Sequence, residues 1–239
     1  MTKRVKKRFT SEVNIIDFQP AYLPQKKQRV HLNPRSANQR EYLDKLQNDQ
    51  TSIVLAIGPA GTGKTMLAVQ HGIKLFQEGI VDKIVVTRPA VSVDEDLGFL
   101  PGTLNEKMAP WTRPIFDVFA EYYQQKDIAK MLEDGVIEIS PLAYMRGRTF
   151  KNAYIIADEC QNTTVNQMKM LLTRLGEGSK MVVTGDLAQA DRMSDNGLID
   201  FCNLLSGKPT KHIDIVEFDH KDIERHNAVK EVLKLYGDS

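Results

Sequence analysis

Short apolar runs alternate with longer amphipathic segments along most of this chain. The runs that predict buried strands cover residues 53–57, 83–87, 136–139, 154–157, 181–184 and 212–218. Apolar residues at helical spacing predict helices over residues 38–46, 64–77, 115–132 and 222–236, and a further helix beginning near residue 163. Strands that are apolar throughout and alternate with helices are typical of parallel sheets covered on both faces. The pattern therefore predicts a three-layer α/β fold with a mostly parallel central sheet.

Two stretches interrupt this alternation. Residues 1–35 contain three prolines and no sustained period, so we expect an extended arm ahead of a single domain over residues 36–239. Ser36 is the predicted N-cap of the first helix. Residues 90–113 combine glycine and proline with little periodicity, which predicts a long, partly structured excursion from the domain.

The distribution of charge distinguishes the arm from the rest of the chain. The whole sequence has a formal net charge of +1, whereas residues 1–35 hold nine Lys or Arg against two acidic residues, which leaves a net −6 over residues 36–239. Such an arm can contact phosphate backbones or remain a solvated tail. No apolar run approaches the roughly 18 residues of a membrane span. Two cysteines without disulfide or zinc spacing favour a cytoplasmic protein.

The segment between the first predicted strand and its helix satisfies the complete Walker A pattern of a phosphate loop. Its residues are Gly58, Pro59, Ala60, Gly61, Thr62, Gly63, Lys64 and Thr65. The glycines allow successive N–H groups to turn inward around an anion, and the helix dipole adds to the attraction. We expect Lys64 to reach the β- and γ-phosphates of ATP and Thr65 to place its hydroxyl on Mg²⁺.

An adjacent acidic pair, Asp158 and Glu159, ends the strand predicted over residues 154–157. Ligands of α/β sheets bind at the carboxyl ends of the strands, which is where a Walker B carboxylate belongs. Asp158 is the expected Mg²⁺ partner, and Glu159 is expected to orient the attacking water and accept its proton. Gln161 and Asn162, just beyond, are compatible with signal transmission or with helix capping.

Other polar residues near the predicted strand ends are weaker candidates. Gln189 follows the strand over residues 181–184 and is a candidate sensor of the γ-phosphate, against an ordinary turn residue. The amide of Gln39 can read the adenine edge. Arg225 is placed by the pattern at the start of the last helix, where it is either an arginine finger or a surface residue. Arg146 and Arg148 fit contact with nucleic acid or γ-phosphate, or a solvated turn.

Several widely spaced segments resemble the PhoH-like family of P-loop ATPases. Besides the phosphate loop and the acidic pair, they are residues 87–90, 97–102, 146–150, 160–164, 167–170, 173–174 and 183–186. The resemblance covers about residues 38–236. It implies a RecA-like core close to the first motor domain of superfamily 1 helicases, and a cytoplasmic ATPase tied to RNA or single-stranded DNA. It also implies Gln189 as the sensor, while Cys160 departs from the family's usual small residue.

The resemblance further implies assembly into homo-oligomeric rings, commonly hexamers. We find no second RecA domain after Ser239, so a neighbouring subunit is expected to complete the cleft, with Arg225 or Arg148 acting in trans. The 35-residue arm is too short for the PIN nuclease module of some relatives, and intrinsic RNase activity is not expected.

Two main functions remain open from the sequence. The first is an ATPase that remodels or translocates on RNA or single-stranded DNA, with base stacking on Trp111 as one option. The second is a nucleotide-dependent assembly switch with slow ATPase activity and no helicase activity. A small-molecule kinase is disfavoured, because residues 90–113 hold Lys107 and Arg113 against four acidic residues and would repel a phosphorylated acceptor.

Overall fold

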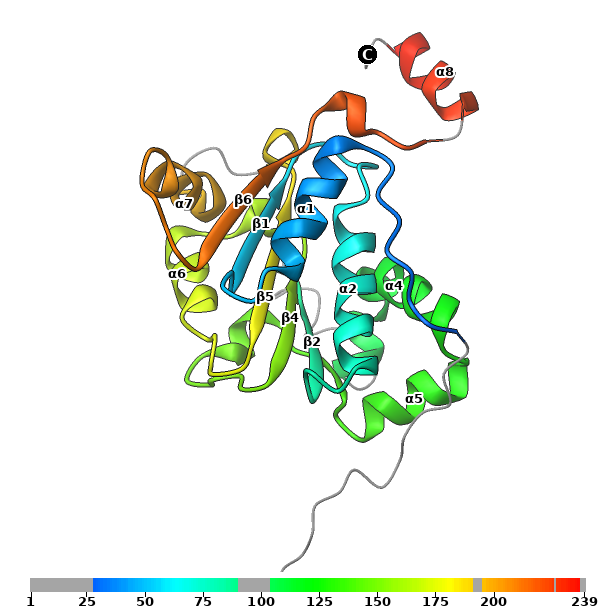
Figure 1. Ribbon diagram of the computed structural model, residues 1–239, viewed down its shortest axis with the longest axis vertical. Helices are drawn as coiled ribbons and strands as arrows, with labels where there is room; N and C mark the ends of the chain where they lie inside the picture. Colours follow the sequence, from blue (N-terminus) through cyan, green and yellow to red (C-terminus); the bar gives the residue numbers. More distant parts are fainter. Residues whose placement is uncertain (1–27, 90–103, 191–194, 226, 237–239) are drawn as a thin grey trace, which may run out of the picture.

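The computed structural model describes residues 28–89, 104–190, 195–225 and 227–236, and its centre is a six-stranded parallel sheet (Figure 1). The strands are β1 (Ile53–Ile57), β2 (Lys83–Thr87), β3 (Ile137–Ile139), β4 (Ala153–Ala157), β5 (Lys180–Gly185) and β6 (Ile213–Glu217). They lie in the order β3-β2-β4-β5-β1-β6, and every neighbouring pair is parallel. The predicted α/β fold with a parallel central sheet is confirmed.

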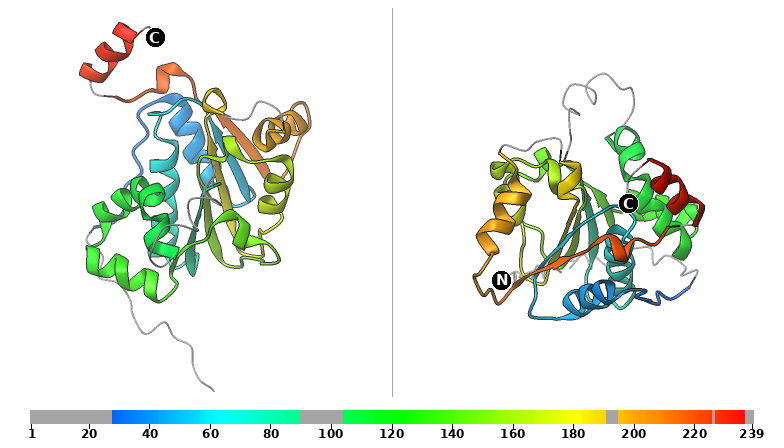
Figure 2. Two further views of the ribbon diagram at one scale, coloured as in Figure 1. Left: turned by 180° about the vertical axis from the view of Figure 1, so that it is seen from behind. Right: turned by 90° about the horizontal axis from the view of Figure 1, so that it is seen from above.

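Helices cover both faces of the sheet, as the view from above shows (Figure 2). One face carries α1 (Ala37–Gln47), α2 (Lys64–Gln77), α4 (Leu104–Tyr122) and α5 (Gln125–Glu133), and the other carries α6 (Val165–Leu172) and α7 (Gly197–Leu205). The last helix, α8 (Asn227–Tyr236), lies beyond the carboxyl ends of the strands, apart from the three layers. Across the described ranges, we find no helix with the length and apolar character to cross a membrane.

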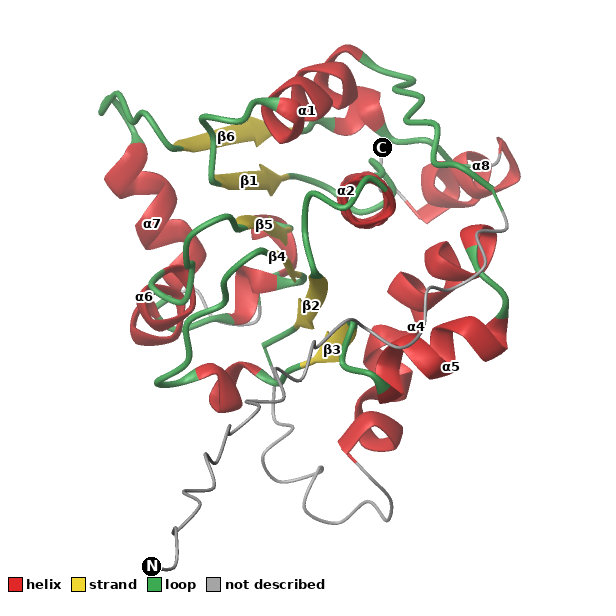
Figure 3. Ribbon diagram, turned by 60° about the horizontal axis from the view of Figure 1, so that its bottom comes forward, coloured by secondary structure: helices red, strands yellow, loops and turns green. Residues whose placement is uncertain are grey.

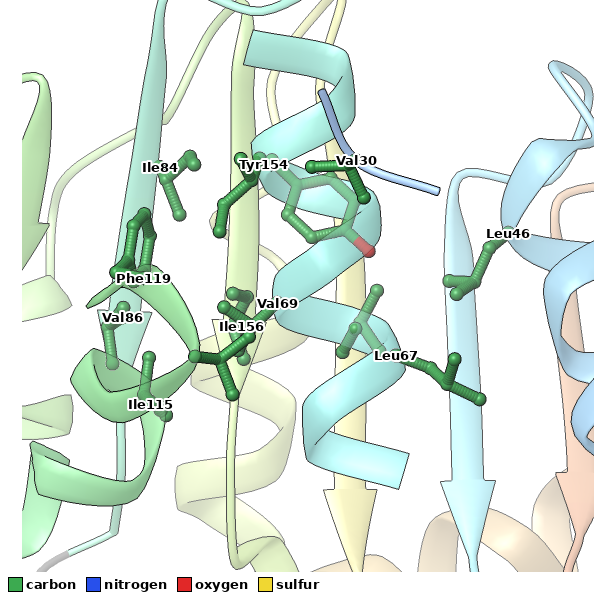
Figure 4. Close-up of a cluster of buried hydrophobic side chains, with 14 of the residues drawn as sticks. Val30, Leu46, Leu67, Val69, Ile84, Val86, Ile115, Phe119, Tyr154 and Ile156 are labelled. Carbon is green, nitrogen blue, oxygen red and sulfur yellow. The ribbon is translucent and has the colours of Figure 1, made fainter. Parts of the chain in front are cut away.

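The strands are apolar throughout because both of their faces are buried. All five residues of β1 and of β4 are buried, which explains their continuous apolar runs. On the α2 and α4 side, Leu67 and Phe119 pack with strand residues such as Ile156 (Figure 4). On the α6 and α7 side, Met168 and Leu198 pack in a second cluster. The strands thus lie between two layers of buried apolar side chains.

The described end of the predicted arm packs against the domain. Val30 is 8% exposed and belongs to the same apolar cluster as Leu67 and Phe119. The side-chain amide of Gln77 donates to the carbonyl of Gln28 at 3.2 Å. Ser36 caps α1 as predicted, because its hydroxyl accepts from the N–H of Gln39. The rest of the arm, residues 1–27, lies outside the described residues.

One helix prediction in the middle of the chain is wrong, because the single helix expected over residues 115–132 is two helices that break at Gln124. Residues 104–113, at the end of the excursion expected to be partly structured, form the first half of α4. Pro110 and Pro114 lie within α4, and both are exposed. Gln124 has extended backbone angles, and the break lets α4 lie along α2 while α5 turns back to β3. Residues 90–103 lie outside the described residues.

The last helix begins later than the sequence predicts. A short 3-10 helix, η4 (His220–Asp222), comes first, and its ends are fixed by a capping box between Asp219 and Asp222. The chain then stays extended, because the N–H of Glu224 bonds to the carbonyl of Gly61 instead of to a preceding turn. Arg225 therefore lies ahead of α8 (Asn227–Tyr236), not on a helix.

Candidate active site

The phosphate loop connects β1 to α2 and has the backbone angles that its glycines predict. Gly61 and Gly63 have φ values of 85° and 82°, which side chains with a Cβ rarely adopt. Helix α2 begins at Lys64, so its free N–H groups and its dipole face the loop. A Cβ on Gly58 would lie 2.3 Å from the carbonyl oxygen of Phe218, which shows how closely the neighbouring chain supports the loop.

Lys64 is held inside its own loop. Its Nζ donates to the carbonyl oxygens of Gly58 at 2.6 Å and Pro59 at 2.7 Å, and the residue is 8% exposed. Burial lowers the pKa of Lys64, and the nearby carboxylates of Asp186 and Glu159 oppose that shift. The ammonium thus has only neutral carbonyl oxygens as its two closest partners, and phosphate oxygens would be stronger acceptors.

The predicted magnesium ligands lie in direct contact. The hydroxyl of Thr65 donates to Oδ1 of Asp158 at 2.7 Å, and the hydroxyl of Thr184 donates to the same oxygen at 2.5 Å. This meeting follows from the strand order, because β5 lies between β1 and β4 and brings the three strand ends together. A buried carboxylate beside a phosphate-loop hydroxyl is the oxygen-rich donor set that Mg²⁺ takes, so these residues fit the ion.

Glu159 has an unusual backbone conformation for its residue type. Its φ of 56° is in the left-handed region, which costs energy in a residue with a long side chain and is often retained at functional sites. The amide of Gln161 donates to Oε2 of Glu159 at 2.5 Å, and Arg88 lies 3.9 Å from Oε1. Arg88 also donates to the carbonyl oxygen of Trp111 at 3.0 Å, which joins α4 to the site.

Gln161 has a clearer role in the structure than in the sequence. Besides holding Glu159, its side-chain oxygen accepts from the N–H of Asp186 at 3.2 Å, and its carbonyl accepts from the amide of Asn196 at 2.6 Å. The capping role that the sequence left open belongs to Thr164, whose hydroxyl accepts from the N–H of Gln167. Gln161 therefore links the acidic pair to the loop after β5 and to α7.

One cavity of about 140 Å³ brings the main predicted residues together. Its lining residues are Ala60, Gly63, Lys64, Thr65, Met66, Asp158, Glu159, Thr184, Gly185, Asp186 and Gln189. Gln189 lies on a 3-10 helix, η3 (Leu187–Gln189), whose start is capped by the side chain of Asp186. The sequence did not single out Arg88 or Thr184 as site residues. Their roles depend on contacts with Glu159 and Asp158 that the fold forms at the ends of β2 and β5.

Gln39 lies behind the phosphate loop and is 2% exposed. Its Nε2 donates to the carbonyl of Thr62 at 3.0 Å, and its Oε1 accepts from the N–H of Arg35 at 2.7 Å. The amide braces the loop in this arrangement, and adenine recognition by Gln39 stays a prediction. Cys160 is fully buried, and burial raises the pKa of its thiol, so the thiolate is disfavoured.

The two arginines considered for catalysis in trans have different surroundings. Arg225 lies against its own phosphate loop, with Nη2 3.3 Å from the carbonyl oxygen of Ala60. Arg148 forms a two-pronged ion pair with Glu138 on β3 and lies over the ring of Phe150. Through the strand registers, Glu138 is level with Ile53 at the start of β1, so Arg148 lies far from the phosphate loop of its own chain.

Comparison with known proteins gives the family of this chain. A family described as PhoH-like protein matches residues 31–237. A PhoH-like protein of Mycobacterium tuberculosis (strain ATCC 25618 / H37Rv) is 46% identical over 208 residues, which cover 86% of this chain and 58% of that protein. A PhoH-like protein of Bacillus subtilis (strain 168) is 45% identical over 204 residues, which cover 84% and 63%.

This chain therefore spans about three fifths of the length of these two relatives. Among solved structures, a Sulfolobus solfataricus SWI2/SNF2 ATPase core in complex with dsDNA has a TM-score of 0.38 and 19% identity, over 69% of this chain and 34% of that one. A likeness that distant carries no argument about function. The family match extends over most of the chain, and the chain belongs to the PhoH-like protein family.

Proposed function

We propose that this protein binds ATP with Mg²⁺ and hydrolyses it. The observation that carries the proposal is the meeting of Thr65 and Asp158 at 2.7 Å beside the phosphate loop, with Glu159 next in the chain. Lys64 binds the β- and γ-phosphates, and Thr65 and Asp158 hold the metal ion. A bound Mg²⁺ neutralises charge that develops on the phosphate oxygens. Glu159 orients the attacking water and accepts its proton, and Gln189 contacts the γ-phosphate.

We further propose that hydrolysis is coupled to RNA or single-stranded DNA. The loop after β3 supports this, because it exposes both an aromatic ring and a cation. Tyr144 is 65% exposed on the 3-10 helix η1 (Leu142–Met145), and Arg146 follows it on the surface. Aromatic stacking and phosphate contact are the two interactions that bind single strands without sequence preference. Arg148 is held by Glu138, so Arg146 is the better candidate for the phosphate contact.

Single-stranded RNA or DNA is expected to stimulate the ATPase rate, and the stimulation is expected to fall with added salt. Arg146→Glu should raise the nucleic-acid concentration that gives half-maximal stimulation by about tenfold, because it reverses the charge at one phosphate contact. The unstimulated rate should stay unchanged. Steady-state ATPase assays across nucleic-acid and salt concentrations measure this. Lys211→Glu is the matched control, since it reverses an exposed charge elsewhere. Absence of any stimulation would favour the assembly switch with slow ATPase activity.

We also propose assembly into a homo-oligomeric ring. Helix α8 supports it, since Val229, Val232 and Leu235 are 40%, 49% and 86% exposed at intervals of three residues. Light scattering after size-exclusion chromatography with Mg-ATP is expected to give a mass several times that of one chain. Leu235→Asp is expected to lower that mass. Lys221→Asp, a control at an exposed residue outside α8, is expected to preserve it. A wild-type monomer with full ATPase activity contradicts the proposal.

A further inference from the structure

The segment after β6 packs against the phosphate loop. The N–H of Glu224 donates to the carbonyl of Gly61 at 2.9 Å, and Nη2 of Arg225 donates to the carbonyl of Ala60. A Cβ at Gly61 would lie 2.6 Å from Nε of Arg225, so the arginine side chain would have to shift if this position carried one. The glycine thus lets the guanidinium lie against the loop.

This segment is tethered to its own chain at several points. The amide of Asn38 donates to Oδ2 of Asp222 at 2.8 Å, which joins α1 to η4. Arg35 lies 3.8 Å from Glu224, although both side chains are largely exposed and this pair contributes little. Together with the bond from Glu224 to Gly61, the link from Asn38 keeps residues 219–225 on the loop. The Arg225 side chain therefore starts from beside the phosphate loop of its own chain.

Arg225 and Lys64 reach the same end of the phosphate loop. Lys64 bonds to the carbonyl oxygens of Gly58 and Pro59, and Arg225 bonds to that of Ala60, the next residue along. In phosphate loops of this pattern the lysine serves the β- and γ-phosphates. The guanidinium bond to Ala60 is long, at 3.3 Å, and its acceptor is neutral. A phosphate oxygen is a stronger acceptor for a guanidinium than a carbonyl is.

We propose that Arg225 binds the γ-phosphate of the ATP held by its own chain, and that it thereby distinguishes ATP from ADP. The inference rests on the proposed ATPase function and replaces catalysis in trans by Arg225 with a contact in cis. The guanidinium exchanges its bond to Ala60 for the terminal phosphate, while the backbone of Glu224 stays on Gly61. ADP lacks that phosphate and leaves Arg225 on the carbonyl.

Equilibrium binding of Mg-ADP and of an imido analogue of Mg-ATP tests the inference. Arg225→Ala is expected to weaken the ATP analogue by about ten- to a hundredfold, the range of a hydrogen bond between charged groups, and to leave ADP affinity unchanged. Arg225→Lys should keep part of the preference. Lys221→Ala, which removes an exposed charge from the same segment, should behave as wild type. Equal losses for both nucleotides, or none, overturn the inference.

The same measurements separate failure of the inference from failure of the proposed function. If Lys64→Ala binds each nucleotide with the same affinity as the wild type, the ATPase proposal itself fails. A mixing experiment then tests cis against trans. Lys64→Ala chains keep Arg225, and Arg225→Ala chains keep the phosphate loop, so equimolar mixing restores ATPase activity only if arginine acts between chains. We expect no restoration, and recovery of activity would return Arg225 to a role in trans.

Discussion

Glu159→Gln is expected to lower the rate of ATP hydrolysis by about two to four orders of magnitude while the protein still binds ATP. Glutamine keeps the shape of the side chain and can still accept from Gln161, so the strained backbone at φ 56° should persist. The amide cannot take a proton from the attacking water, so only the chemical step is lost. Single-turnover hydrolysis and nucleotide binding, measured on the same preparation, separate these two effects.

Glu177→Gln is the matched control, because Glu177 is exposed and lies outside the cavity. Wild-type turnover in the control together with bound but unhydrolysed ATP in Glu159→Gln is the expected outcome. Undiminished turnover in Glu159→Gln would assign the proton transfer to another group. Loss of ATP binding in that variant would instead show that Glu159 is needed to form the nucleotide site.

Gly72→Ala is expected to destabilise the fold by about 1–3 kcal/mol, although alanine is the better helix former. A Cβ at Gly72 would lie 2.5 Å from Cδ1 of Tyr154, whose ring is fully buried between α2 and the sheet. The ring cannot turn away freely, because its hydroxyl lies 3.2 Å from Nδ1 of His71. Burial lowers the pKa of His71 to about 3, so the imidazole is neutral at pH 7.

Denaturant unfolding monitored by circular dichroism measures the loss as a lower midpoint at unchanged slope. Tyr154→Leu removes the ring that the new methyl meets, so the double variant should lose less stability than the sum of the two single variants. Strict additivity of the two changes would show that the destabilisation does not come from this contact.

Much of the fold could be predicted because its elements are set by neighbouring residues. The continuous apolar runs of β1 and β4 indicate strands buried on both faces, and Ser36 caps α1 through a bond within one turn. The helix break at Gln124 could not be predicted, because residues 115–132 keep helical periodicity across it. Its cause is the packing of α4 along α2 and of α5 beside β3, which involves residues far apart in sequence.

The sequence by itself determined the phosphate loop, because Gly61, Gly63 and Lys64 act through local backbone angles and through the start of α2. It also placed Asp158 and Glu159 at a strand end. Only the tertiary structure decided that β5 lies between β1 and β4, which puts Thr65 and Thr184 on one oxygen of Asp158. Strand order depends on packing between distant segments. For the same reason only the fold could show Arg225 lying across its own phosphate loop.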